Sequence, residues 1–349
     1  MASYTNISNP KTKFNTKIYS GTTNTSDALT GVGFQPDLVW LKSRSNAGWN
    51  WLTDAVRGVT KTVYSNETTA EQTNADGVTA FGTDGFTIGN NTDINGSGKT
   101  FVSWNWKANG QGSSNTDGTI NSTYTSADQT SGFSIVTYTG TGSSATVGHG
   151  LGATPSSIFI KELGNANNWH VWHDTLSATQ YLLLESNNSK QNYAPVGIGT
   201  MTNTTFSVGT VTGVNRSGGT YVAYVFSNRR GFSRIGRYVG NASTVESPMI
   251  NCGFKPAWVL IKNADASENW RIYDDKRDTH NHMYKCLFPN VNSVENTTNN
   301  ESEEIDFLAN GFKIRSNAAQ LNGSGQDMFY WAFASEPTVN GLGNPATAR

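Results

Sequence analysis

Charged residues are scarce in this sequence. Asp, Glu, Lys and Arg make up 15% of its 349 residues, and their formal charges sum to −1 at pH 7. An average soluble domain carries about 25% charged residues. Because there is no basic excess, we do not expect nucleic acid as a partner. Ser, Thr, Asn and Gly replace the missing charges, and 10 Trp, 13 Tyr and 16 Phe residues supply bulk for a core. This composition is typical of a β-rich protein with many turns.

Cysteines and long apolar runs are also rare. Cys252 and Cys286 are the only cysteines, too few for a disulfide scaffold or a cysteine-based zinc site. They could pair with each other, although two buried thiols fit a protein made in a reducing cytosol better. No run of 18 apolar residues occurs, and the opening letters MASYTNISNPKTKF contain no apolar core of a signal peptide. We therefore expect no membrane insertion and no Sec export by the chain's own signal.

Three segments of the chain share one layout. Each opens with Tyr-x-Gly and continues to a Gly-x-x-Pro, and an apolar run that ends in Lys follows. Seven or eight residues after the Lys stands a Trp, and an Asp follows five positions later. In chain order, the shared residues are Pro36, Pro155 and Pro256; Lys42, Lys161 and Lys262; Trp49, Trp169 and Trp270; and Asp54, Asp174 and Asp275. One register therefore fits all three copies.

The copies also end alike, with the segments KTFVSWNW, GTYVAYVF and QDMFYWAF. Large apolar residues occupy alternate positions in each, which predicts a strand with one face in a core. The letters GSGKT before the first of these segments resemble a phosphate-binding loop. However, Asp93 stands where that loop needs its first Gly, a strand rather than a helix follows, and the other copies read RSGGT and GSGQD. We therefore expect a turn whose glycines supply positive φ.

These patterns predict an all-β protein with three tandem antiparallel β-sandwich repeats of jelly-roll-like topology. Three blades of about 100 residues would be too few and too long for a propeller. The expected boundaries are an N-terminal arm (1–16), repeat 1 (17–108), a flexible linker (109–131), repeat 2 (132–230), repeat 3 (231–337) and a C-terminal tail (338–349). The linker has almost no charge or bulk, so we expect repeat 1 to move relative to the other two.

Repeat 1 resembles a known domain. Its strings GVGFQPDLVWLKSR, DAVRG, DGFTIG and NGSGKTFVSWNWKA are similar to a repeated β-domain of unknown function in virion structural, tail-fibre-like proteins of marine bacteriophages. Repeat 2 departs from the pattern at LGATPSSIFIKEL and lacks the VRG element, and repeat 3 keeps GFKPAWVLIK and NGFKI. The resemblance implies a virion location, with assembly in the host cytoplasm and exposure on the particle surface. It implies no catalytic residues.

Two groups of residues peculiar to single copies are candidates for ligand binding. Trp169, His170 and Trp172 lie close together in repeat 2, where aromatic faces could stack on a sugar. The alternative is that such aromatics belong to the core. Four arginines gather at the join of repeats 2 and 3, where they could hold an anionic glycan, a phosphate or an acidic virion partner. These are Arg229, Arg230, Arg234 and Arg237. The alternative here is that they pack into an interdomain interface.

Metal and cofactor sites are not predicted. Asp278, His280 and His282 would share one face of an extended strand, but no fourth ligand is evident and a polar loop explains them better. The sequence has no G-x-S-x-G elbow and no dinucleotide-binding context. We therefore expect no cofactor, no metal and no catalytic residue.

The sequence leaves several functions open. The first hypothesis is a non-enzymatic component of a phage tail fibre or appendage that attaches to a host-surface glycan. The second is a capsid-decorating or cement protein that bridges major capsid subunits. A depolymerising enzyme is a third, disfavoured for want of a catalytic constellation. In the first two cases the partners would be other virion proteins, with self-association, for which a trimer is one form.

Overall fold

The fold is almost entirely antiparallel β-structure, which confirms the all-β prediction. A computed structural model describes residues 5–177, 179–193, 197–299 and 301–339. The helices of this described part are three single turns, α1 (Thr92–Asn95), α2 (Thr212–Asn215) and α3 (Ala319–Asn322), and two 3-10 turns, η1 (Pro10–Thr12) and η2 (Glu301–Glu303). Each of the three α-turns precedes a long closing strand.

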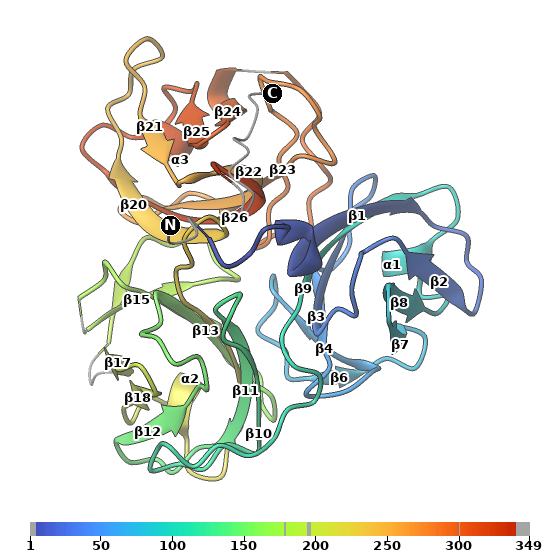
Figure 1. Cartoon of the computed structure of the whole chain (residues 1–349), viewed down its shortest axis with the longest axis vertical. Helices are drawn as coiled ribbons and strands as arrows, with labels where there is room; N and C mark the ends of the chain where they lie inside the picture. The colour runs from blue at the N-terminus through green and yellow to red at the C-terminus, as the bar shows by residue number, and fades with distance from the viewer. Residues whose placement is uncertain (1–4, 178, 194–196, 300, 340–349) are drawn as a thin grey trace.

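The strands form three lobes around a common centre (Figure 1). Lobe 1 contains β1 (Phe14–Ser20), β2 (Asp27–Thr30), β3 (Leu38–Ser43), β4 (Trp51–Asp54), β5 (Lys61–Tyr64), β6 (Gln72–Thr73), β7 (Val78–Gly82), β8 (Gly85–Ile88) and β9 (Thr100–Trp106). Lobe 2 contains β10 (Tyr124–Asp128), β11 (Phe133–Thr139), β12 (Ala145–Gly148), β13 (Ser157–Glu162), β14 (His170–His173), β15 (Gln180–Leu183), β16 (Gln191–Asn192), β17 (Ile198–Met201), β18 (Thr205–Val208) and β19 (Thr220–Phe226). Lobe 3 contains β20 (Ser233–Val239), β21 (Met249–Asn251), β22 (Phe254–Asn263), β23 (Arg271–Asp274), β24 (Ile305–Leu308), β25 (Gly311–Ile314) and β26 (Asp327–Pro337).

Each lobe pairs a large sheet with a three-stranded one. The large sheets run β1-β9-β3-β4-β5-β6, β10-β11-β19-β13-β14-β15-β16 and β20-β26-β22-β23, and the small ones run β2-β8-β7, β12-β18-β17 and β21-β25-β24. The closing strand thus always lies between the opening strand and the strand after Pro. The run β3-β4-β5-β6 is a meander rather than part of the two Greek keys of a jelly roll. The repeat boundaries remain predictions, although this strand order recurs three times.

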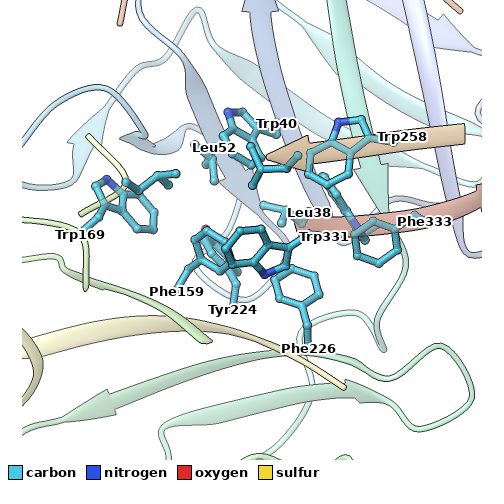
Figure 2. A pocket seen from close by; sticks show the side chains of 13 residues that line it. Leu38, Trp40, Leu52, Phe159, Trp169, Tyr224, Phe226, Trp258, Trp331 and Phe333 are labelled. Carbon is cyan, nitrogen blue, oxygen red and sulfur yellow. The ribbon is translucent and has the colours of Figure 1, made fainter. Parts of the chain in front are cut away.

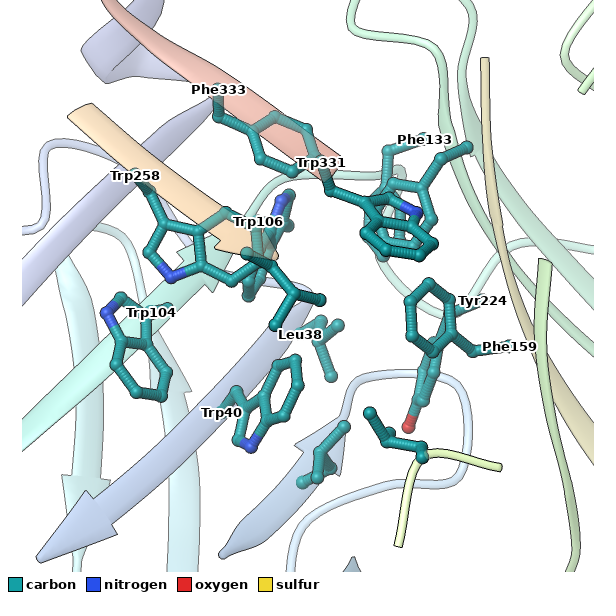
Figure 3. Close-up of a cluster of buried hydrophobic side chains, with 14 of the residues drawn as sticks. Leu38, Trp40, Trp104, Trp106, Phe133, Phe159, Tyr224, Trp258, Trp331 and Phe333 are labelled. Carbon is teal, nitrogen blue, oxygen red and sulfur yellow. The ribbon is translucent and has the colours of Figure 1, made fainter. Parts of the chain in front are cut away.

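The closing strands are buried on both faces, which explains how the lobes associate. In β9 the side chains of Val102, Trp104 and Trp106 enter a cluster shared by all three lobes. Phe101, on the opposite face, is fully buried as well. The equivalent strands β19 and β26 add Tyr224, Phe226, Trp331 and Phe333 to the shared cluster, as Figure 2 and Figure 3 show. Separate, mostly smaller side chains fill the interior of each sandwich. The chain therefore has three lobe cores and one central core.

Two segments that we expected to be loose are partly ordered. In the expected linker, β10 pairs with β11 from Tyr124 opposite Thr137 to Asp128 opposite Phe133, and Ile120 is buried. In the expected arm, β1 already begins at Phe14, and Ile7 packs in the central core. A lack of large side chains does not identify a flexible segment here, because the backbone of an edge strand needs only a neighbouring strand to pair with. The expected tail lies mostly outside the described residues.

The glycine turns before the closing strands are confirmed. Gly98, Gly218 and Gly325 have φ of 73°, 72° and 70° respectively, and nothing lies near a Cβ built at any of the three. These glycines are therefore required by backbone conformation and not by a ligand. In the first copy β9 follows directly at Thr100, so the GSGKT letters form a turn into a strand.

Candidate functional site

The lysine shared by the three copies joins each lobe to a neighbour. Lys42 Nζ donates to the carbonyl of Val291 in lobe 3 at 3.0 Å, and Lys161 Nζ donates to that of Thr68 in lobe 1 at 2.9 Å. Lys262 Nζ donates to the carbonyl of Asn187 in lobe 2, also at 2.9 Å. The bonds run from lobe 1 to 3, from 3 to 2 and from 2 to 1. They form a closed ring, so the three lobes have a pseudo-threefold relation.

Burial lowers the pKa of all three lysines. The pKa falls to about 7 for Lys42 and Lys262 and to about 8 for Lys161, chiefly because an ammonium group is poorly solvated at these positions. Their hydrogen-bond acceptors are carbonyl and amide oxygens rather than carboxylates. The lysines are therefore structural donors that can lose their charge near neutral pH.

A second ring of hydrogen bonds also joins the three lobes. Trp169 Nε1 donates to the carbonyl of Tyr64 at 2.8 Å, and Trp270 Nε1 donates to that of Leu183 at 3.0 Å. In lobe 1 the equivalent position by strand pairing is Asn50, whose Nδ2 donates to the carbonyl of Pro289 at 2.8 Å. The expected alignment of Trp49 with Trp169 and Trp270 is therefore wrong by one residue. Trp49 is 40% exposed and packs against Tyr64.

The carboxylates shared by the copies are also shifted. Strand pairing aligns Asp54 with His173 and Asp274, not with Asp174 and Asp275. Each aligned residue contacts a closing-strand aromatic of a neighbouring lobe. Tyr224 OH donates to Asp54 Oδ2 at 2.8 Å, Trp104 Nε1 donates to Asp274 Oδ2 at 2.9 Å, and Trp331 lies edge-on to His173. These residues therefore hold neighbouring lobes together.

The aromatic candidates of repeat 2 are core residues. Trp169 is 0% exposed, and Trp172 packs in the interior of lobe 2. His170 stacks on Tyr193 and its Nδ1 lies 3.0 Å from the Tyr193 hydroxyl. Burial lowers the pKa of His170 to about 4, so its ring is neutral at pH 7. No ring face is left for a sugar on these three residues, which supports the core alternative.

The four arginines do not form one cluster of free charge. Arg229 donates from Nε to the Gln129 carbonyl and from Nη2 to the Leu151 carbonyl, so it joins two loops within lobe 2. Arg237 Nη1 is 2.6 Å from Asp327 Oδ1. Arg230 and Arg234 are exposed. Neighbouring groups hold Arg229 and Arg237, and Arg234 is near the Asp174 carboxyl, whose pKa burial raises to about 6.

The possible metal ligands of repeat 3 are not brought together. Asp278 accepts from the backbone of Tyr284, whereas His282 Nδ1 lies 2.9 Å from Asp306. His280 contacts the neighbouring Thr279 hydroxyl. Across the described residues, no group of three His, Cys, Asp or Glu side chains could hold a metal ion. Cys252 and Cys286 are free and buried.

The central core contains a small cavity of about 20 Å³ (Figure 2). Its walls are side chains of all three lobes, including Leu38, Phe159 and Trp331, and no polar surface lines it. A cavity of this size holds one water at most, and a water there would find no hydrogen-bond partner. It is a packing defect at the pseudo-threefold centre and not a ligand site.

A larger groove lies between lobes 1 and 2. Its volume is about 410 Å³, and it is open to solvent. Lobe 1 contributes Arg57 and Glu71, and lobe 2 contributes Tyr124, Leu163 and Thr220. Neither the aromatic nor the arginine candidates contribute to this groove. Sequence reasoning missed it because its residues are far apart in the chain and carry no motif.

Comparison with known proteins gives a family. Residues 9–337 match the model of a family described as "Domain of unknown function (DUF7483)". No curated protein and no solved structure matches the chain. None of the helices in the described residues is long and apolar enough to cross a membrane. The match spans all three lobes in one domain, and the chain therefore belongs to the DUF7483 family.

Proposed function

We propose that this protein is a non-enzymatic structural component of a bacteriophage virion, located in a tail fibre or appendage, where it attaches to a host-surface glycan. The observation that carries the proposal is the role of the residues at equivalent positions of the three lobes. The lysines, the buried tryptophans and the residues aligned with Asp54 all join one lobe to another. A chain in which equivalent residues of each lobe hold three lobes together is suited to a structural role.

The resemblance of the repeat 1 strings to a virion β-domain supplies the setting. The three-lobed shape supplies a second argument, because fibres and appendages are symmetric assemblies. A body with pseudo-threefold symmetry can sit on a threefold axis and present three similar faces to its neighbours. Capsid decoration is the second candidate, since the same shape also fits a threefold position of an icosahedral shell.

Cryo-electron microscopy of particles that contain this chain tests the proposal. We expect three-lobed density on the tail, with loops that point away from the particle. Density at the symmetry axes of the shell would replace attachment by decoration. Purified particles that lack the chain altogether would overturn both virion roles.

A further inference from the structure

The three junctions between lobes share one backbone plan. Two positions after the shared lysine of each lobe stands Arg44 in lobe 1, Leu163 in lobe 2 and Ala264 in lobe 3. The N–H of each donates to the closing strand of its own lobe, and its carbonyl accepts from a neighbouring lobe. The cross-lobe bonds are Glu295 N to Arg44 O at 2.9 Å, Glu71 N to Leu163 O at 2.8 Å and Lys190 N to Ala264 O at 2.7 Å. Side chains at the three rims can therefore be compared position by position.

Charged side chains occupy two of the rims. Between lobes 3 and 1, Arg44 binds Glu295 through Nε and Nη2, with the closest contact at 2.8 Å. Between lobes 2 and 3, Lys190 Nζ lies 2.6 Å from Asp265 and 3.8 Å from Asp327, which also pairs with Arg237. At both rims, long side chains of one lobe thus reach across to the other.

At the rim between lobes 1 and 2, the lobe 2 side carries shorter, neutral side chains instead. Leu163 stands at the position of Arg44, Thr137 at that of Arg237, and Thr220 at that of Asp327, as the strand registers show. None of them can bridge to Glu71. The groove of about 410 Å³ lies at this rim. Its volume falls within the range of small-molecule sites, about 300–1,000 Å³.

The polar groups of the groove favour a neutral ligand rich in hydroxyls. Arg57 offers no free charge, because its side chain is 2% exposed and pairs with Asp54 at 2.5 Å and Glu71 at 3.0 Å. Glu71 keeps its other oxygen 4.0 Å from Lys61. The hydroxyls of Tyr124 and Thr220 have no hydrogen-bond partner within the described part of the chain. Acceptors and hydroxyls beside an aromatic ring and an aliphatic side chain suit the alternating polar edge and apolar face of a pyranose.

We propose that the groove between lobes 1 and 2 binds a neutral saccharide unit. This inference rests on the proposed role in glycan attachment and names the site of that contact. Only one junction of the three would bind, because charged side chains fill the other two rims.

The test is binding of sugars to the purified full-length chain by saturation-transfer NMR and calorimetry. The probes are glucose, galactose, mannose and N-acetylglucosamine, with glucuronate and N-acetylneuraminate as acidic counterparts. We expect at least one neutral sugar to bind and the acidic ones to bind at least tenfold more weakly. Leu163→Arg should lower the affinity at least tenfold, because the new side chain can cross the groove to Glu71 as Arg44 reaches Glu295.

Matched variants separate the groove from general effects of charge or folding. Ala166→Arg adds the same charge to the same exposed loop outside the groove and should leave the affinity within twofold of wild type. Thr220→Val removes one hydroxyl at nearly constant volume and should weaken binding severalfold with an unchanged melting temperature. It provides the test if Leu163→Arg does not fold.

Each contrary result has a distinct meaning. Equal binding by wild type, Leu163→Arg and Thr220→Val would place the sugar elsewhere and overturn the inference. Binding of the acidic sugars alone would overturn the ligand class. If no sugar binds but the fluorescently labelled chain still attaches to host cells, the groove inference fails while the proposed function stands. If the chain attaches to no host cell and lies on the capsid shell, the proposed function itself fails.

Discussion

The junction of lobes 3 and 1 and the junction of lobes 2 and 3 make the same contact with different chemistry. At the first, Trp104 donates to Asp274, and Arg277 pairs with Asp274 at 2.5 Å and with Glu295 at 2.8 Å, all within the protein interior. At the second, the neutral ring of His173 stacks on Phe329, with ring centroids 4.4 Å apart. Both junctions seat an aromatic side chain of a neighbouring closing strand, so the aromatic contact is the common element and the buried charges are not.

This comparison agrees with the energetics of buried ion pairs. Desolvation of both ions offsets most of their attraction, so a neutral contact of similar shape can be equally stable. Removal of one partner is different, because it leaves the other charge buried and unpaired. The junction of lobes 3 and 1, which contains the buried charges, should therefore be the more fragile of the two.

Arg277→Ala should have the largest effect. It leaves Asp274 buried without an ion-pair partner and Glu295 with Arg44 alone, and we expect a loss of about 3–5 kcal/mol in the free energy of unfolding. Urea denaturation followed by tryptophan fluorescence measures this loss.

Arg315→Ala is the control. The Arg315 side chain is 34% exposed and the buried Asp306 keeps its contact with His282, so this variant should cost less than Arg277→Ala. Equal losses for the two variants would refute the fragile-junction interpretation.

The buried contact between lobes 2 and 3, where neutral His173 stacks on Phe329, should be sensitive to acid. Burial lowers the pKa of His173 to about 3, whereas an unfolded His titrates near 6.5. Between these values the unfolded state binds the extra proton, so stability falls as the pH decreases from 6.5 towards 3, by up to about 1.4 kcal/mol per pH unit. His173→Phe keeps a ring on Phe329 but cannot titrate. Melting temperatures at pH 6.5, 5.5 and 4.5 should therefore fall more steeply for wild type than for this variant.

Lys262, which joins lobe 3 to lobe 2, gives the same direction of pH dependence in a higher pH window. Its pKa is about 7 in the folded chain, because of burial, and near 10.4 in an unfolded chain. The unfolded state holds the extra proton in this window, so stability due to Lys262 increases from pH 7 to pH 9. Lys262→Met retains the aliphatic stem and should abolish this part of the increase. An identical gain in wild type and variant, measured by chemical denaturation at both pH values, would contradict the assignment.

Arg237→Ala should have the smallest effect. Its partner Asp327 lies at the charged rim between lobes 2 and 3, and the Arg237 side chain is 51% exposed. Exposed ion pairs contribute about 0–1 kcal/mol. We expect a change in melting temperature close to experimental error in 0.15 M salt. A loss comparable with that of Arg277→Ala would show that rim charges, and not the buried ones, hold the lobes together.

Much of the fold could be predicted from local patterns. The alternation of Val102, Trp104 and Trp106 identified a closing strand, and the glycines before it identified a turn. The central core could not be predicted in the same way, because alternation indicates which face is apolar but not what covers it. Ser103 and Asn105, both buried, look like the solvent-facing half of a strand. The clue that was available is the size of the alternating residues, since tryptophans repeated along one face need a large partner surface.

The site depended on spatial register and was less predictable. Trp49 attracted attention as an aromatic residue, yet Asn50 holds the equivalent position, because strand pairing aligns backbones and not residue types. The groove lies where the short, neutral Leu163 takes the position that the long, charged Arg44 has in lobe 1. Such a difference becomes meaningful only after the three junctions are superposed, and a search for motifs within one copy does not detect it.

The covalent connection of the three lobes has a consequence for how the protein can diversify. In a homotrimer of single lobes, every substitution would appear three times, and a groove at one junction would be present at all three. Here each junction is encoded at its own positions, so Leu163, Arg44 and Ala264 can change independently. A tandem chain can thus specialise one junction for recognition while the other two maintain the assembly, a division of labour that exact symmetry forbids.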